Sequence, residues 1–385
     1  MSLGGRWFFH FTHSLSPLEG NSPDSYLIKK ITLSIVSFSF TLVYVALLAF
    51  TPLKSPFISI AFVAGNVYLR FIIFVAAVEV FFSLLKFPFD YYADFVVEHK
   101  FNLSNQTFVR WLGRRLKAAV IGSILGLILL LVFYFLLIDF SNYWWLLFAA
   151  FFFIFQVLAA QLFPTVILPM FYKLKPLSDD ALDLRLSVLV EKFGYRMSGV
   201  YSFDLSRETR KANAALTGLG KSRKIIISDT LLENFSGSEI EVVLAHELGH
   251  LVKHHMMKGI VVSAITSLIG FYFMALAYSA YAGAHGYQPC ELAAIPFLAL
   301  VMIMFGVIVM PLGNFFSRKI EHEADMFALS STGMKREFAE SMRKLAKLNM
   351  TPENPPAWIE KIFFSHPSIG SRIRTALPEG LPEEP

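Results

Sequence analysis

The chain has 385 residues, of which 55% are hydrophobic and only 16% are charged, and it carries a net charge of +5 and one cysteine. Soluble domains have about 25% charged residues, so this composition excludes an ordinary soluble protein and indicates one embedded in a lipid bilayer. The lone Cys290 excludes an internal disulfide framework and a cysteine-rich metal site. The basic residues form no stripe interleaved with aromatics, so the sequence predicts no nucleic-acid partner.

Six apolar runs are long enough to cross about 30 Å of hydrocarbon as helices, which takes about 20 residues each. A polar tail, residues 1–30, precedes them without a signal-peptide core, so we expect the first run to be retained. Four spans are expected within 31–172 and a membrane hairpin at 259–315. The six expected spans are 31–50, 57–85, 118–138, 144–172, 259–284 and 293–315.

Two of these spans contain interruptions. Arg70 and Glu79 fall within the second run, where a charge costs roughly 3 kcal/mol or more unless it faces water or a partner. Either the interior of the bundle is wet, or the second helix begins only after Arg70 and leaves that residue at the membrane interface. Pro164 and Pro169 fall near the end of the fourth run, which we expect to kink or end there.

Positively charged residues orient the chain. The connection 86–117 holds six Lys or Arg, whereas the connections after the third and fifth spans hold none. By the positive-inside rule, 86–117 is a basic cytoplasmic loop. Six spans then place both termini and the polar segments 173–258 and 316–385 on the cytoplasmic side, where we expect the two segments to form one domain.

The segment 173–258 contains helix and strand signals. An amphipathic helix is expected from Asp180 to about Phe193, with Gly194 as its C-cap. Two short strands are expected near 199–203 and 224–228. The last polar segment is expected to be mostly helical up to about residue 350.

A further helix is expected after the second strand. Ser238 followed by Glu241 matches a capping box, which predicts a helix that starts at Glu239. This helix can continue through His255 into the fifth span.

This helix contains the pattern H-E-x-x-H at His246, Glu247 and His250. Residues four apart lie one turn above each other on a helix, so the two imidazoles face one point. Two histidines and a third carboxylate hold a catalytic zinc with an open position, and the free glutamate serves as general base. The pattern alone also occurs by chance on charged helices.

A third ligand must come from the same side of the membrane. After the sixth span, Glu321 and Asp325 lie four residues apart and share a helix face. One can ligate zinc while the other accepts a hydrogen bond from the second nitrogen of a ligand histidine. Taken alone, this stretch also fits a solvated charged helix; together with the H-E-x-x-H pattern and the matching topology, the functional interpretation is favoured.

An ordered set of motifs resembles the type I CAAX prenyl endopeptidase family, which are integral-membrane gluzincin zinc metalloproteases with HtpX-like relatives. The similar blocks cover most of the chain from about residue 87 to 377. They include H-E-L-G-H at 246–250, S-R-x-x-E-x-x-A-D at 317–325, Asn213-Ala214 ahead of Gly218, and 363–367. The resemblance implies a mainly α fold: a polytopic membrane helix bundle of about six spans with a cytoplasmic zincin-like α+β metalloprotease domain.

The resemblance also implies roles for individual residues. It assigns one Zn²⁺ per chain to His246, His250 and Glu321, with Glu247 as the base. Asp325 would support the metal site from behind the ligands.

Further roles implied by the resemblance concern the substrate. Arg318 would pair with a carboxylate or the substrate. His366 would stabilise the oxyanion. Asn213 and Ala214 would hold the substrate backbone by strand addition.

Three polar residues near these positions are not among the assigned ligands. His254 and His255 follow the metal helix and are expected to be interfacial polar residues. Glu323 remains an alternative to Glu321 as the third ligand.

The sequence thus favours an integral-membrane zinc endopeptidase of the CAAX prenyl protease type, working on a peptide or prenylated-protein substrate at the lipid bilayer. An alternative is an HtpX-like quality-control protease with no prenyl requirement, and a remote alternative is a non-catalytic zinc-binding scaffold. A monomer is favoured, in a bacterial inner membrane or an endoplasmic reticulum-type membrane. The familiar eukaryotic members have seven spans and an insertion before the metal helix, whereas six spans and no such insertion are expected here.

Overall fold

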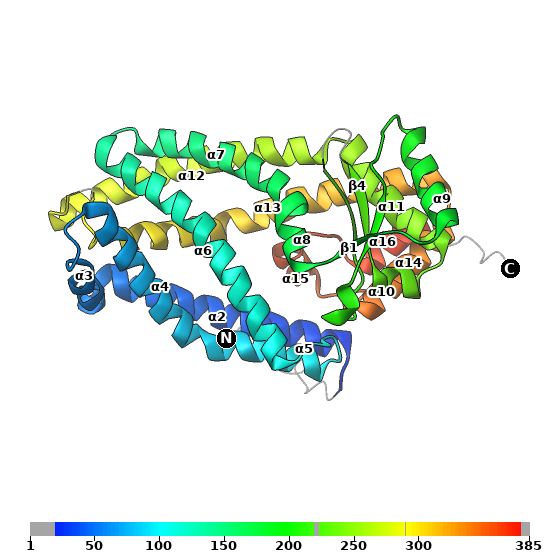
Figure 1. Ribbon diagram of the computed structural model, residues 1–385, viewed down its shortest axis with the longest axis horizontal. Coiled ribbons are helices and arrows are strands. Elements are labelled where there is room, and N and C mark those ends of the chain that lie inside the picture. Colours follow the sequence, from blue (N-terminus) through cyan, green and yellow to red (C-terminus); the bar gives the residue numbers. More distant parts are fainter. Residues whose placement is uncertain (1–19, 219–222, 289, 379–385) are drawn as a thin grey trace, which may run out of the picture.

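Long helices run side by side along most of the molecule, and a small sheet with its own helices lies at one end (Figure 1). The computed structural model describes residues 20–218, 223–288 and 290–378. Most of the expected N-terminal tail and the last residues of the C-terminal tail lie outside the described residues. The predicted architecture, a mainly helical membrane bundle with a small α+β domain, is confirmed.

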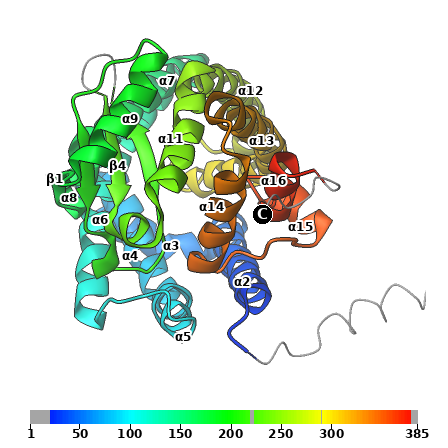
Figure 2. The same cartoon turned by 90° about the vertical axis from the view of Figure 1, so that its right-hand side faces the viewer.

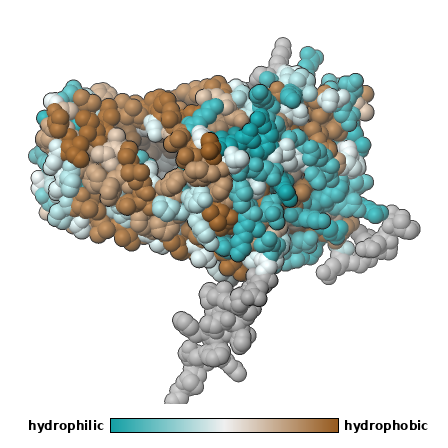
Figure 3. Space-filling model, turned by 60° about the horizontal axis from the view of Figure 1, so that its bottom comes forward, coloured by the Kyte–Doolittle hydropathy of each residue, from teal (hydrophilic) through white to brown (hydrophobic). Residues whose placement is uncertain are grey.

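Six helices of the described residues are long and apolar enough to cross a membrane, as the sequence predicts. On the face shown in Figure 3, the surface of the helix bundle is mostly hydrophobic, whereas the end that carries the sheet is mostly hydrophilic. The first, third, fifth and sixth candidate spans are α2 (Pro23–Phe50), α6 (Phe108–Asp139), α12 (His255–His285) and α13 (Ile295–Thr332). The second consists of α4 (Val67–Tyr91), η2 (Tyr92–Val96) and α5 (Val97–Lys100), and the fourth of α7 (Trp144–Leu162), η3 (Phe163–Ile167) and α8 (Leu168–Phe171).

The second span begins later than its apolar run. The residues before it form η1 (Pro52–Lys54) and α3 (Ser55–Ala61), and Asn66 caps the span by accepting backbone hydrogen bonds. Arg70 therefore lies in the first turn, where its Nε donates to the Ala64 carbonyl at 2.7 Å. The helix thus begins before Arg70 and not after it, but Arg70 lies at the end of the span, as one of the two interpretations of this charge expects.

Proline and basic residues modify the other spans. Pro164 lies in the π-helical turn η3, so the predicted distortion of the fourth span is present.

The basic residues of 86–117 lie on helices, because the second span continues to Lys100 and α6 begins at Phe108. The long connecting loop expected there is reduced to a few residues.

A four-stranded sheet among the described residues has the order β1-β2-β4-β3. Its strands are β1 (Leu174–Pro176), β2 (Val200–Phe203), β3 (Ala214–Thr217) and β4 (Lys224–Ser228). β2 and β4 are parallel, and the other two pairs are antiparallel. The predictions of β2 and β4 are confirmed, and β3 forms one edge of the sheet.

Helices accompany this sheet in the domain, and most of them share a common apolar core with it. They are α9 (Asp180–Lys192), η4 (Leu205–Arg207), α10 (Asp229–Asn234), α11 (Gly237–Val252), α14 (Lys335–Leu348), α15 (Ala357–Phe363) and α16 (Ile369–Ala376). Seen from the domain end, α11 lies between the sheet and the pair α14 and α16 (Figure 2). Leu186, Ile225, Leu244, Leu248 and Phe338 are among the fully buried residues that join these layers.

The start of α11 differs from the prediction. Ser236, not Ser238, is the N-cap, and its capping-box partner is Glu239, whose carboxylate accepts from the Ser236 backbone N–H at 2.7 Å. The sequence contains two overlapping S-x-x-E patterns. The second glutamate, Glu241, pairs with Arg185 of α9 instead, which a local pattern cannot indicate.

The end of α11 also differs. The helix does not continue into the fifth span, because it ends at Val252 and His254 adopts a left-handed conformation with φ of 56°. α12 then begins at His255. By contrast, α13 is one helix of 38 residues that passes from the far end of the bundle into the domain (Figure 1).

Candidate metal centre

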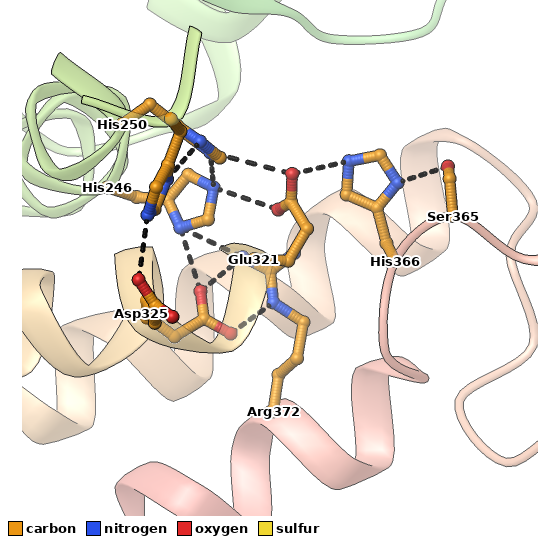
Figure 4. A network of polar contacts seen from close by, with 9 residues as sticks. His246, His250, Glu321, Asp325, Ser365, His366 and Arg372 are labelled. Atoms are coloured by element: carbon orange, nitrogen blue, oxygen red, sulfur yellow. Dashed lines mark hydrogen bonds and ion pairs between the residues drawn. The ribbon is translucent and has the colours of Figure 1, made fainter. Parts of the chain in front are cut away.

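Two helices bring the three predicted ligands together. His246 and His250 lie on α11, and Glu321 lies on α13 (Figure 4). The helices approach closely at Gly249, where a Cβ would lie 3.1 Å from the Ala324 Cα. The small residue in H-E-L-G-H therefore allows the two backbones to come close enough for ligands from both helices to meet.

The separations of the ligand atoms suit a tetrahedral metal. His246 Nε2 lies 3.2 Å from His250 Nε2 and 3.2 Å from Glu321 Oε2, and His250 Nε2 lies 3.5 Å from Glu321 Oε1. Atoms bound at 2.0–2.1 Å and tetrahedral angles would lie about 3.3 Å apart. Glu321 Oε2 is buried and makes no hydrogen bond among the described residues. This set of two nitrogens and one oxygen fits zinc.

A buried carboxylate holds His246 from behind. His246 Nδ1 lies 2.8 Å from Asp325 Oδ1, and Arg372 of α16 donates to both oxygens of Asp325. Burial by itself would lower the pKa of His246, but the nearby carboxylates of Asp325 and Glu321 raise it to about 9. The arrangement fixes which nitrogen of His246 faces Glu321.

Arg372 is a site residue that the sequence prediction missed. The short helix α16 contains two arginines, Arg372 and Arg374, in similar local sequence. Only the tertiary structure distinguishes them, because Arg372 is buried against Asp325 whereas Arg374 is exposed.

The other imidazole on α11 is kept neutral. Burial, together with the nearby His246, lowers the pKa of His250 to about 4. A neutral imidazole is the form that binds metal ions. Glu247, between the two histidines in sequence, is partly buried, and this burial raises the pKa of its carboxyl group.

His366 reaches the metal centre from the C-terminal segment. Its Nε2 lies 3.3 Å from Glu321 Oε1, and its Nδ1 lies 2.9 Å from Ser365 Oγ (Figure 4). The side chain is 58% exposed, so it faces the open side of the centre. Desolvation lowers the pKa of His366, which favours a neutral ring.

Arg318 does not lie where the sequence places it. The prediction pairs it with a carboxylate or the substrate, but its Nη1 donates to the backbone carbonyls of Glu360 at 3.1 Å and Phe364 at 2.6 Å. It therefore holds the turn that precedes His366. On α13, Arg318 lies nearly one turn before Glu321, and these hydrogen bonds join it to α15 and to the residue that follows α15.

The two predicted substrate-binding residues lie at the edge of the sheet. Ala214 is the first residue of β3, and Asn213 immediately precedes it. The backbone N–H of Asn213 donates to Ser228 Oγ at 2.9 Å, which fixes the start of the strand on β4. β3 also contacts α11, so an extended chain bound along this edge would lie beside the metal helix.

Of two neighbouring residues, His255 differs from expectation, whereas Glu323 is not a ligand, in line with the choice of Glu321. His255 is not an interfacial residue, because it is only 3% exposed and contacts His250. Glu323, the alternative third ligand, does not belong to the group of ligand atoms and lies against His255 instead.

Comparison with known proteins agrees with this description. Residues 176–379 match the family model described as peptidase family M48, and residues 11–173 match the one described as CAAX prenyl protease N-terminal, five membrane helices. The family description names five membrane helices, and the described residues 20–173 of this chain contain four candidate spans.

Individual relatives are similar at low identity. CAAX prenyl protease 1 of Saccharomyces cerevisiae is 25% identical over 315 residues, covering 77% of this chain and 69% of that protein. An uncharacterized metalloprotease of Bacillus subtilis, YhfN, is 29% identical over 223 residues, covering 55% and 51%. The chain thus spans about half to two thirds of the length of these relatives.

The fold itself is similar to a solved structure. The crystal structure of S. mikatae Ste24p matches with a TM-score of 0.79 at 23% identity, covering 94% of this chain and 91% of that one. Since the M48 match alone covers more than half of the chain, the protein belongs to peptidase family M48, as a membrane metalloprotease with multiple spans.

Proposed function

We propose that the protein is a zinc endopeptidase of the CAAX prenyl protease type, with zinc held by His246, His250 and Glu321. The observation that carries this proposal is the spacing of their ligand atoms, 3.2 to 3.5 Å, in a buried group of two nitrogens and one oxygen. When bound, zinc supplies Lewis-acid activation of water and of the scissile carbonyl.

The residues of the chain account for proton transfer. Glu247 accepts a proton from the attacking water and passes it to the leaving nitrogen, and the raised pKa of its carboxyl group suits this task. His366 donates from Nε2 to the oxyanion; Ser365 Oγ can donate to its Nδ1 and so keep the hydrogen on Nε2. Asp325 and Arg372 hold His246 in position.

The edge of the sheet binds the substrate in this proposal. An extended peptide adds to β3 as a further strand, with Asn213 and Ala214 at its start, through backbone hydrogen bonds that do not depend on sequence. Arg318 acts indirectly, by holding the backbone turn from which His366 reaches the centre.

The substrate is proposed to be a prenylated C-terminal peptide. The match to CAAX prenyl protease 1 supports this class. The second candidate is general turnover of membrane proteins with no prenyl requirement; the bacterial metalloprotease matched at higher identity is uncharacterized and does not decide between the two.

Cleavage of matched farnesylated and unmodified peptides by the purified protein separates the two candidates, with Glu247→Gln as the inactive control. We expect the farnesylated peptide to be preferred by the wild type and neither to be cut by the variant. Equal cleavage of both moves the substrate to membrane-protein turnover. No cleavage despite bound zinc contradicts the enzyme assignment and supports a zinc-binding scaffold.

We also propose that the catalytic domain is cytoplasmic, on the basis of the six Lys or Arg in 86–117. Single cysteines introduced in a Cys290→Ser background can report which side of the membrane a position faces. One is placed at Gln288, which is exposed in the connection between α12 and α13, and the other at Arg336, which is exposed in the domain. An impermeant thiol reagent added to intact cells should label only Gln288→Cys; labelling of Arg336→Cys alone would invert the topology.

A further inference from the structure

The second nitrogen of ligand His250 contacts another histidine, not a carboxylate. His250 Nδ1 lies 3.0 Å from His255 Nδ1, and His255 Nε2 lies 3.1 Å from Glu323 Oε2. Lys258 donates to the same Glu323 oxygen at 2.8 Å. The four residues therefore form a chain of polar contacts from the metal centre outwards.

The pattern of donors and acceptors in this chain is determined by its ends. His250 presents Nε2 to the other ligands, so its hydrogen lies on Nδ1 and is donated to His255 Nδ1. His255 then carries its own hydrogen on Nε2 and donates it to Glu323. Lys258 donates to the same oxygen of Glu323, so each contact in the chain has one donor and one acceptor.

Burial increases along this chain from Lys258 to His255. The side chains of Lys258 and Glu323 are 43% and 32% exposed, whereas that of His255 is 2% exposed. A buried imidazole with both nitrogens hydrogen-bonded is held in one orientation. His255 thus presents a fixed acceptor to His250.

The two histidine ligands are consequently supported in different ways. His246 contacts the carboxylate of Asp325 directly, whereas an imidazole lies between His250 and the carboxylate of Glu323. A neutral imidazole is a weaker acceptor than a carboxylate, but it gives the same directional constraint on the ring of the ligand.

The break between α11 and α12 makes this contact possible. If α11 continued, residue 255 would lie about 140° around the helix from His250 and would point away from it. The left-handed conformation of His254 turns the chain, and His255 becomes the first residue of α12. A contact between residues five apart is therefore a consequence of the turn.

From these contacts we propose that His255 is a positioning residue for the metal centre. Together with Glu323, which Lys258 holds, it fixes the tautomer and ring orientation of His250. The proposal rests on the proposed zinc site. It assigns His255, Glu323 and Lys258 a role in metal affinity without contact to the metal or the substrate.

The test measures zinc affinity of the purified full-length protein by competition with a chromophoric chelator, in a Glu247→Gln background so that catalysis plays no part. His255→Ala should bind zinc about 10- to 100-fold more weakly, as expected for loss of an outer partner of a ligand. His255→Gln should restore most of the affinity, because its amide can accept from His250 and donate to Glu323. His322→Ala, which removes an exposed histidine next to Glu321, is the matched control and should not change the affinity.

Each outcome decides between the possibilities. Equal zinc affinity in His255→Ala and His322→Ala overturns the proposal. If His255→Ala does not elute as a folded protein, Glu323→Ala and Lys258→Met decide: both should weaken zinc binding, the first more than the second, and wild-type affinity in Glu323→Ala refutes the role. Absence of zinc binding in the parent protein instead contradicts the proposed metal site itself.

Discussion

Arg372 of α16 binds Asp325 of α13 through two hydrogen bonds, from Nε to Oδ2 at 2.9 Å and from Nη2 to Oδ1 at 2.6 Å. Asp325 is only 1% exposed, so Arg372 is the charge that compensates it in the interior. The contact also joins the last helix of the chain to the helix of the third proposed ligand. The pair of Arg372 and Asp325 should therefore contribute both to the stability of the fold and to metal binding.

We therefore expect Arg372→Met to destabilise the protein by about 3–5 kcal/mol, because it leaves the buried Asp325 carboxylate without its arginine and with only the contact to His246. Thermal unfolding in detergent measures this change. Arg374→Met, two residues further on the same helix at an exposed position, is the control and should have little effect. Equal stability of the two variants would contradict the importance of the buried pair.

His366 should affect turnover but not metal binding. Because its Nε2 lies beside Glu321 but outside the group of ligand atoms, His366→Ala should lower kcat roughly 10²- to 10³-fold, as the loss of one oxyanion donor does in other hydrolases. Zinc content measured by atomic emission should stay the same. Loss of zinc from this variant would show that His366 is a ligand.

Gly249 should tolerate no larger residue. A methyl group there would lie 3.1 Å from Ala324 Cα and 3.1 Å from Phe327 Cδ1, so Gly249→Ala should push α11 from α13 and weaken zinc binding. In Gly259→Ala, where the added group meets nothing within 4 Å, the stability should stay the same or rise by up to about 1 kcal/mol. Wild-type zinc affinity in Gly249→Ala would contradict the close-approach argument.

Acid should weaken the attachment of α14 to the start of α11. Burial alone would raise the pKa of Glu239, but hydrogen bonds from Lys344 and Ser236 lower it. A carboxylate with a lowered pKa stabilises the fold above its unfolded value of about 4.3, and this contribution is lost as the pH falls through the lower folded value. Lys344→Met should therefore cost about 1 kcal/mol at pH 7, because Lys344 is 43% exposed.

The difference between Lys344→Met and the wild type should shrink as the pH falls below the unfolded value of about 4.3 and should vanish once the pH is below the lowered pKa of Glu239 in the folded wild type. Urea unfolding as a function of pH measures it. A difference that is constant with pH would attribute the effect to packing alone.

The sequence predicts those parts of the molecule that repeat a local pattern. The spans follow from apolar length, β4 from the run Ile225-Ile226-Ile227, and α9 from its amphipathic sequence and Gly194, which has φ of 78°. Helix spacing brings His246 and His250 together, and the parity of the spans places a carboxylate of α13 on their side of the membrane. These inferences need only neighbours in sequence and the side of the membrane, whereas the choice of Glu321 over Asp325 as the ligand comes from the family resemblance.

Other features depend on contacts between residues that are far apart in the sequence. Glu239 and Glu241 are equivalent in local sequence, and Arg185 and Lys344 decide which of them caps α11. Arg372 and His255 act on ligands from separate helices. The turn at His254 replaces a continuous helix because α11 packs on α13 and the sheet, while α12 lies along α7 in the bundle.

The single helix α13 has a mechanical consequence. Glu321 lies on a rod that is anchored among the membrane helices, whereas His246 and His250 lie on a rod that is separated from its span by the turn at His254. A tilt of α13 in the bilayer would act on Glu321 through continuous helix, whereas it would reach the two histidines only through the packing of α11 on α13 at Gly249. The far side of the membrane is thus joined to one carboxylate of the centre by a single unbroken rod.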